Sequence, residues 1–259
     1  MEHAKEKKAK RRVWLILIVV LVVIAAGSLG IYLWQEFAPN DFDPSGYKKE
    51  PTGSSAASEA AVLRDNPIDF TAIRADNEDV CGWITVPDTQ IDYPIMQSSR
   101  ASDDFYLDHN VKGNYDINGA IYIQRLNSYD FSDPNTVIYG HNMRNGSMFQ
   151  NLHNFRDPAF FESHDTFYIY TPGHILTYRI FAAYRYDNRH ILNSFNFADK
   201  EVFAEYIASC LNPNSMLRSV REGVTVTTDD KIVTLSTCIN DARYRYLVQG
   251  VLINDESTN

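Results

Sequence analysis

The first long apolar run in the chain lies near its N-terminus, where residues 13–34 carry no charged side chain. A helix rises about 1.5 Å per residue, so a run of this length can cross a hydrocarbon core of about 30 Å. Trp14, Tyr32 and Trp34 stand near its two ends, where amphipathic rings favour the membrane interface. The pattern predicts a transmembrane anchor over residues 13–35.

A signal peptide removed after secretion is the alternative interpretation, since Ala25, Ala26 and Gly27 are small enough for a cleavage site. The apolar run exceeds the roughly 7–15 residues of a signal-peptide core, which favours the uncleaved anchor. Residues 1–12 hold six Lys or Arg against two Glu. The positive-inside rule then leaves this basic tail in the cytoplasm and the rest of the chain outside the cell.

The segment after the anchor, residues 36–60, is rich in Pro, Gly, Ser and Ala. This composition predicts a flexible linker, because few apolar groups are available to offset the ordering entropy. Residues 61–259 are then the globular, extracellular domain. At its start, apolar positions over residues 59–77 recur at helical spacing and predict a helical extension, which Pro67 divides or restarts.

Beyond this extension the pattern is mostly that of short strands separated by turn signals. We predict strands over residues 82–86, 91–95, 120–123, 136–139, 166–171, 175–184, 231–237 and 244–253. Helical spacing recurs over residues 147–163 and over residues 197–211, where Asp199 is a candidate N-cap. Many short strands with few helices predict a mainly β fold, closed or nearly closed as a barrel.

Charge excludes one class of partner. The net charge is −9 and the first twelve residues carry +4, so the remainder carries −13. Nucleic acid requires a basic face, and we therefore expect no nucleic-acid partner. The chain has three cysteines, an odd number that leaves at least one thiol free outside the cytosol.

Cys238 is the cysteine best placed for chemistry, because it ends an apolar run on the face that also carries Thr234 and Ser236. A small buried hydrophobe is the competing interpretation, since free Cys is usually buried. A reactive thiolate needs a basic or cationic partner. His141 follows a hydrophobic strand and Gly140, which permits a sharp exit, so its ring is expected at the rim of that strand.

Two arginines follow the cysteine and could stabilise charge on an attacked carbonyl oxygen. Arg243 and Arg245 are two residues apart and can share one face of a strand. An ordinary pair of surface arginines has the same pattern.

Together these segments resemble the sortase family. Residues 234–238 (Thr-Leu-Ser-Thr-Cys), followed by Arg245 at the head of an apolar strand, are similar to its signature. Residues 139–143 (Tyr-Gly-His-Asn-Met) resemble its histidine segment in the class B form. The resemblance extends over about residues 66–253. Arg245, rather than Arg243, matches the final strand of the family in register.

The resemblance implies a closed β-barrel of about eight strands with an N-terminal helical extension and a helix between strands six and seven. It implies a membrane-bound transpeptidase on the surface of a Gram-positive cell, with neither a metal nor an organic cofactor. Cys238 would attack the Thr carbonyl of an Asn-Pro-x-Thr-like sorting signal at the C-terminus of a secreted protein. The thioacyl group would then pass to an amine of a peptidoglycan precursor or of a pilin.

In this family pattern His141 would be the acid and base, and Arg245 would steady the oxyanion. Ser236 matches a position that assists substrate binding. Asn118 and Tyr122 are further candidates for lining the substrate groove, although plain turn and strand roles suit them as well.

Two other functions fit parts of the sequence. One is a different extracellular Cys–His hydrolase or protease, but such enzymes usually present the Cys at a helix N-terminus, whereas Cys238 follows a β-run. The other is a tethered binding domain without activity, because aromatic-rich strands suit binding equally well.

Overall fold

The computed structural model describes residues 2–37, 39–49, 63–99, 102–239 and 241–259. The chain divides into two compact units, residues 1–39 and residues 40–259. The first unit is one helix, α1 (Glu2–Phe37), so the predicted basic tail is helical and continuous with the apolar run. Lys10–Trp34 within α1 is long and apolar enough to be a candidate membrane span.

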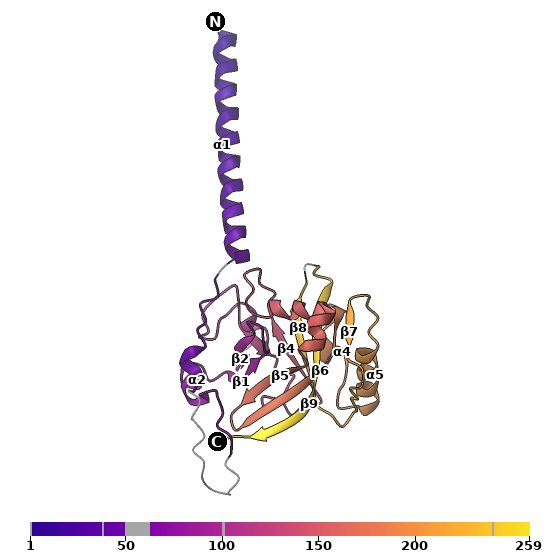
Figure 1. The fold of residues 1–259 in the computed structure, drawn as a ribbon. Coiled ribbons are helices and arrows are strands. Elements are labelled where there is room, and N and C mark those ends of the chain that lie inside the picture. Colours follow the sequence, from indigo (N-terminus) through magenta and orange to yellow (C-terminus); the bar gives the residue numbers. More distant parts are fainter. Residues whose placement is uncertain (1, 38, 50–62, 100–101, 240) are drawn as a thin grey trace. The chain divides into compact units, whose positions relative to one another are not determined.

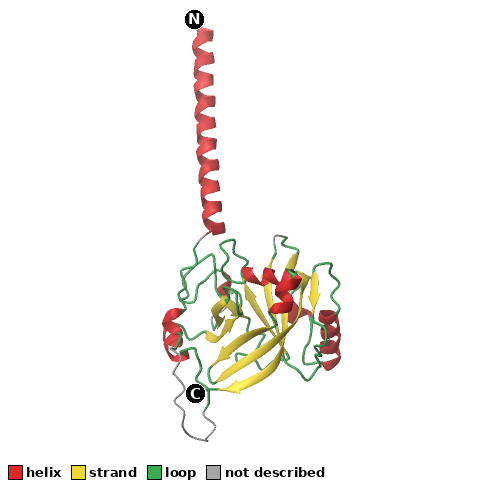
Figure 2. Cartoon of the chain, viewed as in Figure 1, coloured by secondary structure: helices red, strands yellow, loops and turns green. Residues whose placement is uncertain are grey.

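The second unit is built on a β-barrel (Figure 1, Figure 2). Its strands are β1 (Val80–Thr85), β2 (Asp92–Gln97), β3 (Ile121–Ile123), β4 (Asn135–Gly140), β5 (Thr166–Thr171), β6 (His174–Asp187), β7 (Arg218–Val220), β8 (Ile232–Cys238) and β9 (Tyr244–Ser257). Eight of them follow one another in the order β5-β1-β2-β3-β4-β8-β9-β6, and β6 pairs back with β5. The predicted closed barrel is confirmed, and β7 pairs with β6 as an additional strand.

Most neighbouring strands are antiparallel, but β2–β3 and β4–β8 run parallel. The helices are short: α2 (Phe70–Asp76), α3 (Pro158–Ser163), α4 (Ile191–Ser194) and α5 (Lys200–Leu211), with 3₁₀ turns η1 (Ser45–Tyr47), η2 (Phe105–Leu107) and η3 (Gln150–Arg156). The helix predicted between strands six and seven is α5, which lies between β6 and β7, whereas the short α4 in the same connection was not predicted. Asp199 caps α5, since its side chain accepts hydrogen bonds from two backbone N–H groups of the first turn.

Alternation along β8 separates two cores. Val233 and Leu235 belong to the main apolar cluster that fills the barrel. Thr234, between them, faces the other way, where its hydroxyl lies 2.7 Å from Oε1 of Gln249. On that outer side Phe203 and other apolar residues of α5 form a second cluster against the barrel. The face assignment made from the sequence is thus confirmed at these positions.

The helix predicted over residues 59–77 is much shorter in the structure. Residues 59–62 lie outside the described residues, and helix begins only at Phe70, capped by Asp69. Before it, Arg64 and Ile68 form isolated bridges with Thr258 and Lys48. These backbone pairings hold the residues ahead of α2 extended, so tertiary contacts override the helical spacing there.

The segment predicted as a linker contains a structured part. Residues 40–49 belong to the second unit, while residues 50–62 lie outside the described residues. Phe42 packs against buried Trp83 and Tyr93, with ring centroids 5.9 and 6.1 Å apart. The compact unit therefore begins about twenty residues ahead of the boundary that composition suggested, at residue 40 rather than 61.

Candidate active site

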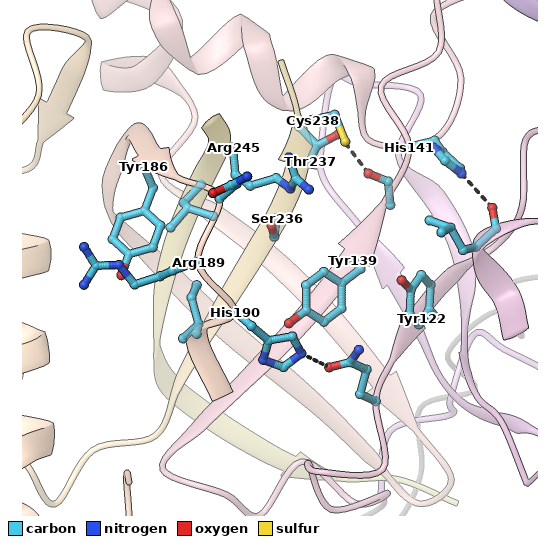
Figure 3. Close-up of a pocket in the computed structure, with 16 residues that line it drawn as sticks. Tyr122, Tyr139, His141, Tyr186, Arg189, His190, Ser236, Thr237, Cys238 and Arg245 are labelled. Atoms are coloured by element: carbon cyan, nitrogen blue, oxygen red, sulfur yellow. Dashed lines mark hydrogen bonds between the residues drawn. The ribbon is translucent and has the colours of Figure 1, made fainter. Parts of the chain in front are cut away.

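The ends of β4, β8 and β9 meet at one rim of the barrel (Figure 3). β8 runs parallel to β4 with Gly140 opposite Thr237, so His141 and Cys238 each follow a paired position. β9 runs antiparallel to β8 and places Arg245 directly opposite Cys238. The Thr237 hydroxyl donates a 2.8 Å hydrogen bond to the Gly140 carbonyl and ties the strand ends together. Strand register thus gathers the predicted cysteine, histidine and arginine.

Cys238 is exposed, although every earlier residue of β8 is buried. The other two cysteines are buried. Burial raises the pKa of the Cys210 thiol to about 12 and that of Cys81 further still. The thiolate is the nucleophilic form, so both buried thiols are poor nucleophiles. Among the three cysteines, Cys238 alone combines exposure with a position beside basic side chains.

His141 is held from two sides. Its ring Nε2 lies 2.6 Å from the carbonyl oxygen of Leu107 in η2. A carbonyl oxygen only accepts, so Nε2 carries the hydrogen and Nδ1 is the basic nitrogen of the neutral ring. The backbone N–H of Phe149 donates a 2.9 Å hydrogen bond to the His141 carbonyl. In this state the ring's hydrogen bond goes to Leu107, not to the sulfur of Cys238.

A glycine is required at residue 140 because no space is left for a Cβ atom, and not because of an unusual backbone angle. Its φ lies outside the left-handed region, unlike that of Gly119, whose φ is +60°. A Cβ added to Gly140 would lie 2.5 Å from Ile121 Cδ1 and 2.7 Å from Phe149 Cγ. The sharp exit expected from the sequence is therefore a close approach of β4 to neighbouring side chains.

The two arginines have different surroundings. Arg243 forms an ion pair with Asp241 at 2.7 Å, and its side chain is 80% exposed. Arg245 lines the pocket next to Cys238, and its guanidinium contacts the backbone carbonyls of Ala242 and Tyr244 at 3.4 and 3.1 Å. The guanidinium of Arg245 thus contacts no carboxylate among the described residues and faces the pocket, which favours it over Arg243.

A pocket of about 230 Å³ opens beside these groups. Its walls come from β3, β4, β8, β9, the end of β6 and α4; besides His141, Cys238 and Arg245 they include Leu107, Tyr122, Gln124, Tyr139, Tyr186, Asn188, Arg189, His190, Ser236 and Thr237. Of the predicted substrate-binding residues, Ser236 and Tyr122 line the pocket. Both side chains are nearly buried, at 4% and 6% exposed.

Asn118 is not among the residues that line this pocket. It is 2% exposed and sits in the turn before β3, where its side-chain N–H group donates to Asp116 at 2.9 Å. Gly119 follows with φ +60°, and a Cβ there would lie 2.5 Å from the Leu107 carbonyl oxygen and 2.6 Å from that of Tyr106. The turn interpretation of Asn118 accounts for these contacts.

Aromatic rings make one wall of the pocket largely apolar. Tyr122 and Tyr139 stack with centroids 5.5 Å apart. Burial raises the pKa of Tyr139 to about 12 and that of Tyr122 further, so both hydroxyls stay neutral at physiological pH. Desolvated walls of this kind strengthen hydrogen bonds and charge interactions with a bound peptide.

Two histidines near the site were assigned in the sequence only to loop or helix positions. His190 caps α4 by accepting from Asn193 N, so its Nε2 carries the hydrogen and donates to Gln124 at 2.7 Å (Figure 3). His153, in η3, lies with Nε2 3.1 Å from the Cys238 carbonyl. Burial lowers the pKa of His153 to about 4, and the nearby Arg156 charge adds to this. His153 is thus a neutral donor that fixes the backbone of the cysteine.

An exposed thiol beside an imidazole and a guanidinium, in a cleft with apolar walls, is suited to acyl transfer through a covalent thioester. The thiol supplies the nucleophile, the imidazole moves protons, and the guanidinium can hold a developing oxyanion.

Comparison with known proteins agrees with this chemistry. The family model described as Sortase domain matches residues 84–253. Sortase B from Listeria monocytogenes is 37% identical over 182 residues, covering 68% of this chain and 71% of that protein. Sortase B from Clostridium perfringens is 30% identical with a TM-score of 0.64, covering 71% of this chain and 99% of the solved one. A sortase B structure from B. anthracis is 32% identical with a TM-score of 0.64, covering 73% of this chain and 85% of the solved one.

Proposed function

Because this chain belongs to the sortase family of cysteine transpeptidases, we propose that Cys238 cleaves a sorting signal and transfers the acyl group to an amine. The observation that carries the proposal is the strand register that gathers Cys238, His141 and Arg245 beside one pocket. Sorting-signal peptides are the substrates of this family, and sortases act at the cell surface.

In the first half of the reaction, Cys238 gives its thiol proton to Nδ1 of His141, and the resulting thiolate attacks the Thr carbonyl carbon of an Asn-Pro-x-Thr-like signal. The guanidinium of Arg245 stabilises the tetrahedral oxyanion. The C–N bond breaks, the departing amine takes a proton from His141, and a thioester remains on Cys238. The Nε2–H group of His141 keeps its hydrogen bond to the Leu107 carbonyl while Nδ1 carries the transferred proton.

In the second half, an amine of a peptidoglycan precursor or of a pilin enters and gives its proton to His141. The amine attacks the thioester carbon, the new amide forms, and Cys238 leaves as a thiolate that takes the proton back from His141. A thioester keeps the acyl group activated, so the amine can compete with water. Ser236 and Tyr122, which line the pocket, are proposed to contact the signal peptide.

The location that we propose follows from the chain's charge pattern. Residues 13–35 form a single membrane anchor with residues 1–12 in the cytoplasm, because the basic cluster precedes the apolar run. The barrel unit then works on the extracellular face, where secreted substrates and wall precursors are both found.

The test uses the full chain in detergent with a quenched peptide that carries Asn-Pro-x-Thr before a small residue, with and without added amine. We expect cleavage after Thr, an amine-linked product by mass, and loss of both in Cys238→Ala. Cys81→Ala, which removes a buried thiol, is the matched control and retains cleavage. Acid as the sole product despite added amine would indicate a hydrolase, and no cleavage across a set of such signals would indicate a binding domain.

A further inference from the structure

The segment that leaves the membrane helix lies against the loop that carries His141. We define the strap as residues 40–48 and the histidine loop as residues 141–149. The strap is attached by its C-terminal end to the segment before α2, where the N–H of Asp69 donates to the Tyr47 carbonyl at 2.8 Å. Lys48 adds an ion pair with Asp92 of β2.

The N-terminal end of the strap packs on Tyr93, a residue of β2 that is 9% exposed. The ring of Phe42 lies 6.1 Å from that of Tyr93, and Asn40 Nδ2 lies 3.5 Å from both the Tyr93 hydroxyl and the Met148 sulfur. Strap, Tyr93 and Met148 together line a second cavity of about 550 Å³, separate from the pocket beside Cys238.

Tyr93 in turn holds the histidine loop. Its hydroxyl accepts a 3.2 Å hydrogen bond from the backbone N–H of Met148. Met148 has φ +57°, a left-handed conformation that costs free energy in a residue with a side chain and persists only where contacts hold it. The same residue is bridged to Asn142, and the next, Phe149, donates to the His141 carbonyl at 2.9 Å.

We propose that the strap is a positioning element for the acid–base group. Phe42 seats Tyr93, Tyr93 fixes the strained turn at Met148, and that turn sets the backbone of His141. This inference rests on the proposed role of His141 and deepens it. The segment whose composition predicts a linker would thus be part of the catalytic apparatus.

The experiment compares the full chain with Phe42→Ala, Phe42→Leu and Tyr93→Phe. Tyr93→Phe removes only the hydroxyl, which accepts from the Met148 N–H and from Asn40 Nδ2. Tyr168→Phe, on β5 and outside both cavities, is the matched control. Amide hydrogen exchange of the peptide spanning residues 141–149 is measured first, because it reports whether the strap and Tyr93 hold the histidine loop without requiring catalytic turnover.

We expect faster exchange in the histidine loop of Phe42→Ala and Tyr93→Phe, with the α5 peptide unchanged. Both variants should lower kcat about tenfold with KM for the signal peptide within about twofold, because the loop sets geometry and not peptide affinity. Phe42→Leu keeps an apolar side chain against Tyr93. It should therefore restore most of the wild-type kcat and most of the wild-type exchange rate in the histidine loop.

An exchange rate in the histidine loop of Tyr93→Phe and Phe42→Ala equal to that of the wild type would show that the strap does not hold this loop, whether or not the protein is active. Faster exchange with wild-type kcat would overturn the positioning role. A uniform rise in exchange over all peptides would assign the strap to global stability alone. A chain that cleaves no signal peptide at all would refute the proposed function. The exchange experiment would still decide whether the strap holds the histidine loop.

Discussion

Gly140→Ala is expected to damage both stability and turnover, because β4 passes close to its neighbours at this residue. The added methyl would lie 2.5 Å from Ile121 Cδ1 and 2.7 and 2.8 Å from two ring carbons of Phe149. Carbon atoms in contact are normally about 3.5–4.0 Å apart. The neighbours must therefore give way by about 1 Å, and Phe149 is fully buried, at 0% exposed.

The magnitude follows from this overpacking. An extra methyl in a filled core costs about 1–3 kcal/mol. For a domain of this size that corresponds to a fall in melting temperature of about 2–12 °C. Since the Phe149 N–H holds the His141 carbonyl, a displaced ring also moves the imidazole. A displacement of about 1 Å in a catalytic group can lower kcat by about 100-fold.

Thermal unfolding and turnover of the quenched peptide are measured side by side on the full chain. Gly30→Ala is the control, because Gly30 lies in α1 and a Cβ there meets no atom within 4 Å. It should change neither quantity. Gly140→Ala with a wild-type melting temperature and wild-type kcat would show that the barrel relaxes at no cost. Close packing around residue 140 would then constrain neither the fold nor the position of His141.

Three further expectations concern charge and thiol reactivity. Burial lowers the His153 pKa from 6.5 to about 4. The contribution of neutral His153 to the free energy of unfolding is therefore complete above about pH 6.5 and is lost as the pH falls toward 4. Between about pH 7 and about pH 5 the free energy of unfolding should fall by about 1 kcal/mol after allowance for screening. Urea unfolding at both pH values measures it, and an identical pH dependence in His153→Phe would contradict it. Arg245→Ala should lower kcat/KM by about 100-fold, whereas Arg243→Ala, on a side chain that is 80% exposed, should change it less than about twofold; equal losses would argue against this assignment. Iodoacetamide should modify Cys238, which is exposed, and leave Cys81 and Cys210 unlabelled in peptide mass mapping, because burial raises the pKa of both buried thiols. Equal labelling of all three cysteines would show that burial does not protect the other two.

The barrel could be predicted because its strands are marked locally. β5, for example, begins and ends where the sequence pattern predicted, at Thr166 and Thr171. Alternation on β8 likewise placed Val233 and Leu235 inside. Such signals depend on side-chain period and turn residues within one segment. The strap shows the opposite case, since a Pro-, Gly- and Ser-rich average concealed Phe42, whose packing depends on residues forty and more positions away.

The candidate site divides in the same way. Cys238 and His141 end apolar runs, so their place at a rim could be inferred, but the parallel register of β4 and β8 that brings them together leaves no mark in either segment. His153 could not be found at all, because what it recognises is the backbone carbonyl of a residue 85 positions later. A carbonyl is the same at every residue, so no side-chain pattern signals such a contact. Groups that act directly on a substrate can thus be proposed from residue type and position, whereas those that hold the backbone beneath them require the fold.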